Sequence, residues 1–77
     1  MTETQAKVVK AMAENQLNMS RTAKALHYHR TAIYKHVIRV LDQTGKDMRD
    51  FYDMTKLLRE ADVVLGTARR DENADWE

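Results

Sequence analysis

The sequence predicts an all-α fold, because of its residue composition and the spacing of its apolar residues. The 77-residue chain contains no proline and only two glycines, Gly45 and Gly66. Proline and glycine are the residues that interrupt helices most strongly, so their scarcity favours long helical segments. Apolar residues also recur at intervals of three and four, as on the buried side of an amphipathic helix. We therefore expect four helices, over residues 3–15, 19–26, 30–44 and 50–65.

The size and composition of the chain limit the class of protein. A chain of 77 residues forms one small domain, which buries only about 60 % of the surface that its unfolded chain exposes. We therefore expect self-association to contribute to stability. The absence of cysteine excludes disulfides and thiolate metal sites. We expect a folded domain over residues 1–66 and a flexible acidic tail over residues 67–77.

The sequence gives no sign of a membrane or secreted protein. No apolar run approaches the roughly 20 residues of a membrane-spanning helix. The N-terminus also lacks the basic-then-apolar pattern of a signal sequence. We therefore expect a cytoplasmic protein.

The first helix begins with a capping box, in which the side chains of Thr2 and Gln5 each satisfy the other residue's free amide. Leu17 is expected to fill the core where the chain turns after this helix. The buried side of the helix is predicted from apolar residues at helical spacing, with Val8 beside them: Ala6, Val9, Met12 and Ala13.

The second helix follows Asn18 or Ser20, either of which can cap it. A helix of about eight residues is not stable alone, so it must be held by packing. Ala23 and Leu26 are expected to face inward. Residues 27–29 form the turn to the third helix.

In this turn, His27 is expected to adopt the left-handed backbone conformation, because histidine is enriched there among non-glycine residues. Tyr28 is expected to fill the space between the helices. Gly45 then ends the third helix by supplying a positive φ. The inward side of the third helix is predicted to contain Ile33, Val37, Val40 and Leu41.

The fourth helix is capped by Asp47 or Asp50 and ends at Gly66. Its apolar face is broader than one edge of a small domain needs. It is therefore either core, packed on the first and third helices, or a dimer interface. The face consists of Phe51, Met54, Leu58, Ala61 and Leu65, widened by Leu57 and Val64; the candidate interface residues are Phe51, Met54, Leu58 and Leu65.

The charge of the chain is unevenly distributed. Residues 20–46 contain six basic residues against a single acid, Asp42, for a formal charge of +5. Residues 1–19 are neutral, and residues 47–77 carry −4, so the net charge of +1 hides a basic middle. A basic surface of this kind is typical of a nucleic-acid partner.

The basic segment also has the apolar spacing of a helix-turn-helix. Such a motif needs a small residue in its first helix, a turn residue four positions later and an aliphatic residue about six beyond that. Ala23, His27 and Ile33 meet this spacing, although the usual turn glycine is missing. The fold class we predict is therefore a tri-helical helix-turn-helix bundle with an additional C-terminal helix.

The motif predicts which side chains contact double-stranded DNA, because the start of its second helix enters the major groove. Arg30 can donate two hydrogen bonds from its guanidinium to the edge of a guanine. The expected base-reading residues are His29, Arg30, Thr31, Tyr34 and Lys35. The expected phosphate contacts are Ser20, Arg21, Thr22, Arg39 and Lys46.

The run S-R-T-A-K-A-L-H-Y-H-R, with the later L-D-Q-T-G and D-M-R-D-F-Y-D-M-T-K-L-L, resembles the C-terminal DNA-binding domain of the PucR and carbohydrate-diacid regulator family. The resemblance covers roughly residues 6–58 and is most specific at L-H-x-H-R. There is a more distant similarity to the DNA-binding end of Fis-type proteins. The resemblance implies bacterial transcription regulation.

This chain departs from the family pattern in two places. It has Thr31-Ala32 where the family has Asn-Thr, and Lys35-His36 where the family has Tyr-Arg, so base preference does not carry over. The family also carries large N-terminal sensory regions. We expect either a free-standing small regulator or one whose sensing comes from a larger sensory protein.

Other functions are less well supported by the residues. His27, His29 and His36 lack a cysteine or nearby acid to complete a tetrahedral set, so we expect no metal and no cofactor. Ser20 with a histidine lacks an oriented acid or oxyanion loop, so we expect no enzymatic activity. The alternative function is a protein-interaction or adaptor module that docks a larger regulator through the fourth helix and the acidic tail. Trp76 in that tail is expected to belong to a frayed end; a docking role for it is the less favoured interpretation.

Overall fold

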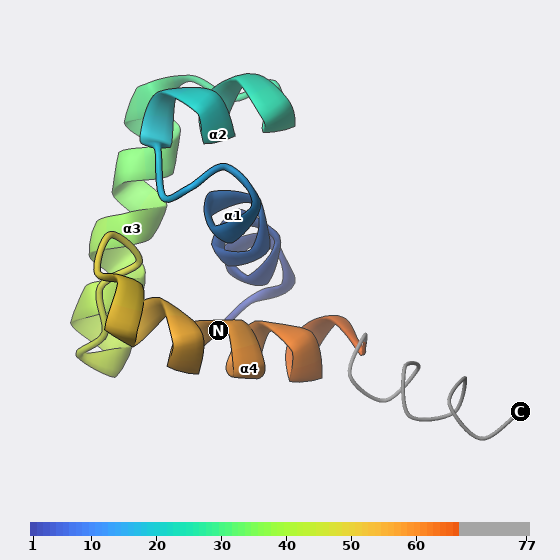
Figure 1. The fold of residues 1–77 in the computed structure, drawn as a ribbon, viewed down its shortest axis with the longest axis vertical. Coiled ribbons are helices and arrows are strands. Elements are labelled where there is room, and N and C mark those ends of the chain that lie inside the picture. The colour runs from blue at the N-terminus through green and yellow to red at the C-terminus, as the bar shows by residue number, and fades with distance from the viewer. Residues whose placement is uncertain (67–77) are drawn as a thin grey trace, which may run out of the picture.

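The computed structural model of this chain describes residues 1–66, which contain four helices and no strand. The helices are α1 (Glu3–Glu14), α2 (Met19–Leu26), α3 (Arg30–Thr44) and α4 (Phe51–Leu65). Figure 1 shows α1 in the middle of the bundle, with α2 and α3 around it and α4 crossing below. The predicted all-α class is confirmed, and each predicted helix end lies within one residue of the observed end. The tail predicted over residues 67–77 lies outside the described residues.

The four helices share one apolar core, to which α1 contributes most. Its Val8, Val9 and Met12 are completely buried, and α1 makes its most extensive contact with α4. Removing these side chains from water is the main force that holds so small a bundle together. The core consists of Ala6, Val8, Val9, Met12, Ala23, Ile33, Val37, Val40, Met48, Met54, Leu57 and Ala61.

One predicted core position, Tyr28, is wrong, and two residues of the α4 face, which the sequence left open between core and dimer interface, lie outside the core. Tyr28 is 41 % exposed, Val64 is 40 % exposed and Phe51 is 76 % exposed. The buried residues of α4 are Met54, Leu57 and Ala61, and Phe51 precedes them as the first residue of the helix. The Tyr28 ring stacks on His36 of α3, with 6.5 Å between ring centroids.

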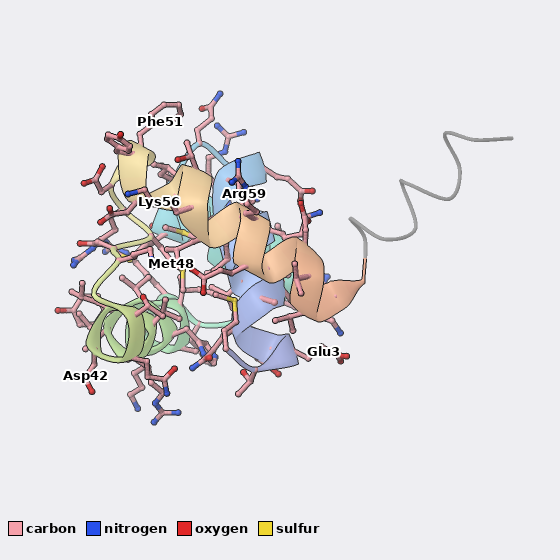
Figure 2. All side chains as sticks on the ribbon, turned by 90° about the horizontal axis from the view of Figure 1, so that it is seen from below. Glu3, Asp42, Met48, Phe51, Lys56 and Arg59 are labelled. Atoms are coloured by element: carbon pink, nitrogen blue, oxygen red, sulfur yellow. The ribbon has the colours of Figure 1, made fainter. Side chains whose placement is uncertain are left out.

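Met48 occupies core space for which no residue was predicted. It precedes α4 and is completely buried, and Figure 2 shows it between the ribbons of α3 and α4. Its burial fixes the connection between these two helices against the rest of the molecule.

Both ends of α1 are closed by local hydrogen bonds. The predicted capping box is present: the Gln5 N–H donates to Thr2 Oγ1 (3.1 Å), and the Thr2 N–H donates to Gln5 Oε1 (2.9 Å). At the other end, Gln16 has a φ of 60°, and the Leu17 N–H donates to the Met12 carbonyl (2.8 Å). This is a Schellman motif, in which the residue after the left-handed position packs back on the helix. Leu17 does pack against the core, as predicted.

The turn between α2 and α3 is built in the same way. His27 is left-handed, with φ 58° and ψ 40°, as predicted. The Tyr28 N–H donates to the Ala23 carbonyl (2.8 Å), and the His27 N–H donates to the Lys24 carbonyl (3.2 Å). These two bonds complete a Schellman motif with histidine where glycine is usual. The backbone of this turn therefore does not depend on glycine.

The remaining helices are capped by residues that the sequence predicted for this role. Asn18, rather than Ser20, caps α2 by accepting from the Arg21 N–H (3.0 Å). Asp50, rather than Asp47, caps α4 by accepting from the Tyr52 N–H (2.8 Å). α3 and α4 end at left-handed glycines, Gly45 (φ 75°) and Gly66 (φ 76°).

Two ion pairs join α4 to its neighbours. Lys10 Nζ lies 2.8 Å from Asp62 Oδ1, and Lys46 Nζ lies 3.5 Å from Glu60 Oε2. Partly exposed pairs of this kind contribute only about 0–1 kcal/mol each, so they orient α4 more than they stabilise it. None of the helices in residues 1–66 has the length and apolar character needed to span a membrane.

Replacing His27 by glycine is expected to stabilise the domain, because glycine adopts the left-handed conformation without a steric cost. After the larger chain entropy of unfolded glycine is subtracted, we expect a net gain of about 0.5–1 kcal/mol. That gain would raise the melting temperature by roughly 2–8 °C, measured by circular dichroism.

The matched control is Ala25→Gly, at an exposed position inside α2, the helix that ends before His27. There glycine is expected to lower the free energy of unfolding by about 0.5–1 kcal/mol. If both substitutions lowered the melting temperature equally, the left-handed turn would not limit stability.

Candidate nucleic-acid interface

The first half of α3 presents a polar face to solvent. Ile33, Val37 and Val40 are completely buried, so the opposite side of the helix points away from the core. The five predicted base-reading residues are all exposed: His29, which is the N-cap residue of α3, and Arg30, Thr31, Tyr34 and Lys35 in its first turns. Tyr34 lines one shallow hollow with Arg30 and Thr31 and a second with Lys35, so these four side chains are neighbours on the exposed surface of α3.

The backbone at the start of α3 is also accessible. His29 is the N-cap residue, but its side chain makes no capping hydrogen bond. The free N–H groups of a first helical turn attract anions, helped by the helix dipole. Beside them, Met19 and Tyr34 line a shallow hollow together with Arg30 and Thr31. The first turns of α2 and α3 thus meet at one surface.

The predicted phosphate contacts at the start of α2 divide into two groups. Ser20 and Arg21 are exposed, and Arg21 Nη1 donates to Gln16 Oε1 at 3.3 Å. Thr22 is completely buried, and its hydroxyl donates to the Asn18 carbonyl at 2.7 Å. The Thr22 side chain therefore serves the packing of α2, and we remove it from the candidate contacts.

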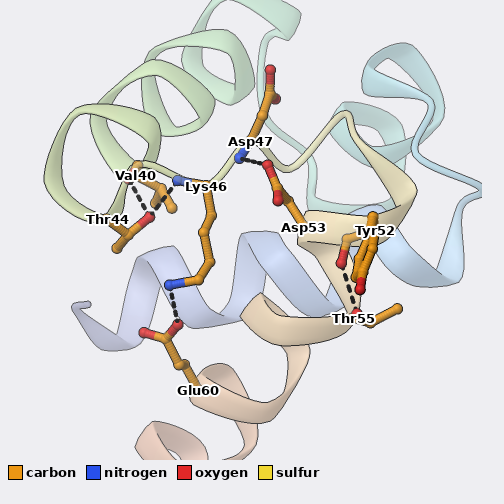
Figure 3. Close-up of polar contacts among 8 residues, drawn as sticks. All are labelled: Val40, Thr44, Lys46, Asp47, Tyr52, Asp53, Thr55 and Glu60. Atoms are coloured by element: carbon orange, nitrogen blue, oxygen red, sulfur yellow. Dashed lines mark hydrogen bonds and ion pairs between the residues drawn. The ribbon is translucent and has the colours of Figure 1, made fainter.

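The two predicted contacts farther along α3 also differ from each other. Arg39 is exposed and lines a second shallow hollow with Tyr34, Lys35, Ile38 and Asp42. Lys46 lies beyond the end of α3 and pairs with Glu60 of α4 (Figure 3). Because that pair neutralises its charge, Lys46 adds little to the basic surface.

His36 lies at the border between this surface and the core. Its Nδ1 atom is buried and has no hydrogen-bond partner in the described residues. Burial, and secondarily the charge of Arg39, lowers the pKa of His36 below its ordinary value of 6.5. The histidine therefore favours the neutral form and serves as a packing partner of Tyr28.

Arg49 is a basic residue of this surface that the sequence reasoning missed. Its guanidinium carbon lies 5.9 Å from the centroid of the Tyr34 ring, and its Nε lies 2.9 Å from Asp47 Oδ1. The hydrogen bond from Arg49 lowers the pKa of Asp47, and the same bond raises the pKa of Arg49. The only sequence signal was a lone arginine in the short connection after Gly45.

The candidate dimer interface on α4 is only partly accessible. Met54 is 2 % exposed, so its side chain belongs to the core and is removed from the candidate residues. Phe51 is exposed, whereas Leu58 and Leu65 are half-buried. Beside Phe51 lies an apolar hollow, whose lining residues come from α4 and from the end of α1: Ala13, Gln16, Leu17, Phe51, Met54, Thr55 and Leu58.

The three histidines do not form a metal site with other ligands. In the part of the chain that the structure describes, no three His, Cys, Asp or Glu side chains lie close enough together to hold a metal ion. His27 and His29 are exposed in and beside the turn, whereas His36 packs on Tyr28.

The lowered pKa of His36 predicts that the domain loses stability in acid. Above its ordinary pKa of 6.5, the histidine is neutral in both the folded and unfolded states. As the pH falls below that value, the unfolded chain binds the proton first, so the free energy of unfolding decreases. We expect His36→Gln to show a smaller decrease than the parent chain between about pH 7.5 and about pH 5.5, measured by urea denaturation. An equal decrease in both proteins would contradict this assignment.

The comparison with protein-family models agrees with this geometry. The model of the PucR C-terminal helix-turn-helix domain matches residues 5–59, which include the whole of α2 and α3 and most of α1 and α4. A search of curated proteins and a search of solved structures each returned no significant match. Because the family model covers more than half of the 77 residues, the chain belongs to the PucR C-terminal helix-turn-helix domain family.

Proposed function

We propose that this protein is a sequence-specific transcriptional regulator that places α3 in the major groove of DNA. The observation that carries the proposal is the solvent-exposed start of α3, where Arg30, Tyr34 and Lys35 are exposed on a helix that Ile33, Val37 and Val40 anchor in the core. Membership of a helix-turn-helix family of DNA-binding domains supports DNA as the partner. We further propose a bacterial, cytoplasmic protein without catalytic activity.

Each exposed residue has a role that suits its chemistry. Arg30 donates to the edge of a guanine, a contact that discriminates by about 1–3 kcal/mol. Thr31 donates to a base or a phosphate, and its methyl group contacts thymine. Tyr34 and Lys35 reach base edges or flanking phosphates. His29, at the start of α3, contacts a neighbouring phosphate.

The start of α2 is proposed to position the domain on the DNA backbone. Ser20 and Arg21 contact phosphates, and Arg39 extends the basic footprint along α3. Contacts of this kind carry little sequence information, but they supply most of the salt-dependent affinity. The domain therefore separates base reading, at the start of α3, from anchoring, at the start of α2.

A homodimer is the proposed functional form. One small module buries little surface on DNA and binds only modestly, whereas two modules about 34 Å apart match the two halves of a palindromic site. Phe51, Leu58 and Leu65 are the proposed interface residues, and the apolar hollow beside Phe51 supports this choice. A larger sensory protein is a further proposed partner.

The test of DNA recognition compares two arginine variants on a site chosen by random-sequence selection. Arg30→Ala is expected to weaken binding to the selected site by about 1–3 kcal/mol and to relax one base position. Arg21→Ala is expected to weaken all sequences alike and to reduce the salt slope by about 1. Fluorescence anisotropy at several salt concentrations measures both effects.

The control is Arg59→Ala, which removes the same charge from the exposed side of α4 (Figure 2). It is expected to leave the affinity for the selected site unchanged. No binding to DNA at low salt by protein free of nucleic acid, together with no effect of Arg30→Ala, would overturn the proposal.

The second candidate function is an adaptor that docks a larger regulator through α4. It is favoured by the exposure of Phe51 (76 %) and Tyr52 (69 %) at the start of that helix. Phe51→Asp distinguishes the candidates. An adaptor loses partner capture in this variant and keeps it in Arg30→Ala, whereas a dimeric regulator becomes monomeric by sedimentation and keeps its base preference.

A further inference from the structure

The connection between α3 and α4, residues 45–50, is held in one conformation by hydrogen bonds to the two helices that it joins (Figure 3). The Gly45 N–H donates to the Leu41 carbonyl (2.8 Å), and the Lys46 N–H donates to Thr44 Oγ1 (3.1 Å). The Asp47 N–H donates to Asp53 Oδ2 (3.0 Å). Backbone groups satisfied in this way limit the motion of a loop.

The middle of this α3–α4 loop is also fixed by packing and by a second set of bonds. Met48 is completely buried in the core. The Arg49 N–H donates to Asp47 Oδ1 (2.8 Å), and the Asp50 N–H donates to the Asp47 carbonyl (3.1 Å). Arg49 therefore projects from a rigid part of the backbone, between a buried residue and a helix cap.

The side chain of Arg49 is fixed as firmly as its backbone. Its Nε and Nη2 atoms donate to the two carboxylate oxygens of Asp47, each at 2.9 Å. Its guanidinium also lies over the ring of Tyr34, 5.9 Å from the centroid. Such a bidentate pair determines where the planar guanidinium faces, and a stacked ring restricts it further. The side chain remains 38 % exposed.

This arrangement leaves donors of Arg49 available to a ligand. A guanidinium has five N–H groups, and Asp47 accepts from two of the side-chain nitrogens, Nε and Nη2. Within residues 1–66, Arg49 Nη1 donates to no other group. One edge of the Arg49 guanidinium thus binds the Asp47 carboxylate, and its outer N–H groups are free to donate to an anion. Lysine, with a single ammonium, cannot hold both partners in this way.

Tyr34 indicates which anion this is. The tyrosine is exposed and lines one hollow with Arg30 and another with Lys35, on the surface proposed to enter the major groove. A helix in that groove is flanked on both sides by the phosphates of the two strands. Arg49 comes from a separate loop that lies beside Tyr34, so it reaches the edge of the groove rather than its floor.

We propose that Arg49, oriented by Asp47 and stacked over Tyr34, binds a DNA backbone phosphate beside the groove that α3 occupies. This inference rests on the proposed function and adds a contact that lies outside the two helices of the helix-turn-helix. The contact fixes the position of α3 in the groove from a third segment of the chain, the α3–α4 loop. It also assigns Asp47 a positioning role, although its charge alone would repel DNA.

The experiment measures how DNA affinity depends on salt. Each phosphate contact contributes about 0.9 to the slope of log K against log salt. We therefore expect Arg49→Ala to reduce the slope by about 0.9 and to weaken binding at low salt on the order of tenfold. Arg49→Lys is expected to keep the slope and to lose affinity. Lysine keeps the positive charge, but its single ammonium cannot bind Asp47 and a phosphate as the planar guanidinium does.

Arg59→Ala is the matched control, because it makes the same change of charge on the outer side of α4 (Figure 2), and it is expected to leave the slope unchanged. Arg49→Gln is the second variant, since its amide still donates to Asp47 and preserves the loop. It is expected to reduce the slope as Arg49→Ala does. Circular dichroism checks that each variant is folded.

The outcomes separate this inference from the proposed function. If the parent chain binds DNA with a slope that Arg21→Ala reduces, while folded Arg49→Ala and Arg49→Gln keep the parental slope, the Arg49 contact is overturned and the proposed function stands. If Arg49→Ala and Arg59→Ala reduce the slope equally, the effect is one of net charge and the contact is also overturned. If the parent chain does not bind DNA, both proposals fail.

Discussion

The burial of one side of α3 is the constraint on which the rest of the structure depends. Ile33, Val37 and Val40 are completely enclosed by the other helices, and a helix buried along one side must expose the other. Because apolar burial is worth about 1.5–3 kcal/mol for each large side chain, α3 cannot rotate without losing much of the stability of so small a domain. The direction in which Arg30 and Tyr34 face is therefore a consequence of the core. The apolar packing of one side of α3 thus determines which polar residues of the helix face solvent.

Two connections hold α3 in that orientation, and neither is a flexible linker. Before α3, the Schellman motif at His27 closes the end of α2 and sets the angle at which the next helix begins. After α3, the α3–α4 loop is fixed by the buried Met48 and by the hydrogen bonds of Asp47. The surface proposed to bind DNA is thus supported at both ends by ordered backbone. Such preorganisation reduces the entropy that is lost on binding.

The apolar residues of α4 are divided between the core and a surface proposed for self-association. Met54, Leu57 and Ala61 complete the core on α1, and the ion pairs of Asp62 and Glu60 orient the helix. Phe51 and Tyr52 remain exposed at its start, which is unusual for large aromatic residues unless a partner covers them. The intramolecular core uses only part of the apolar face, and the remainder is the surface proposed for self-association. The core and the proposed interface are therefore adjacent surfaces of one helix rather than alternatives.

The sequence by itself determined the helices, because their start and stop signals are local. The Thr2–Gln5 capping box, the left-handed His27 and the glycine after Thr44 each depend on neighbouring residues alone, and the structure contains all three. The exposure of Thr31 and Lys35 likewise follows from helical periodicity, whereas Arg30 is exposed as the first residue of α3. Only the tertiary structure decided the depth of burial and the contacts between distant segments. Thr22 and Met54 proved to be buried, Tyr28 and Phe51 proved to be exposed, and Arg49 proved to lie over Tyr34. Periodicity specifies the side of a helix that faces inward, but the limit of each contact is set by how neighbouring helices cross, and that depends on the packing of the whole chain.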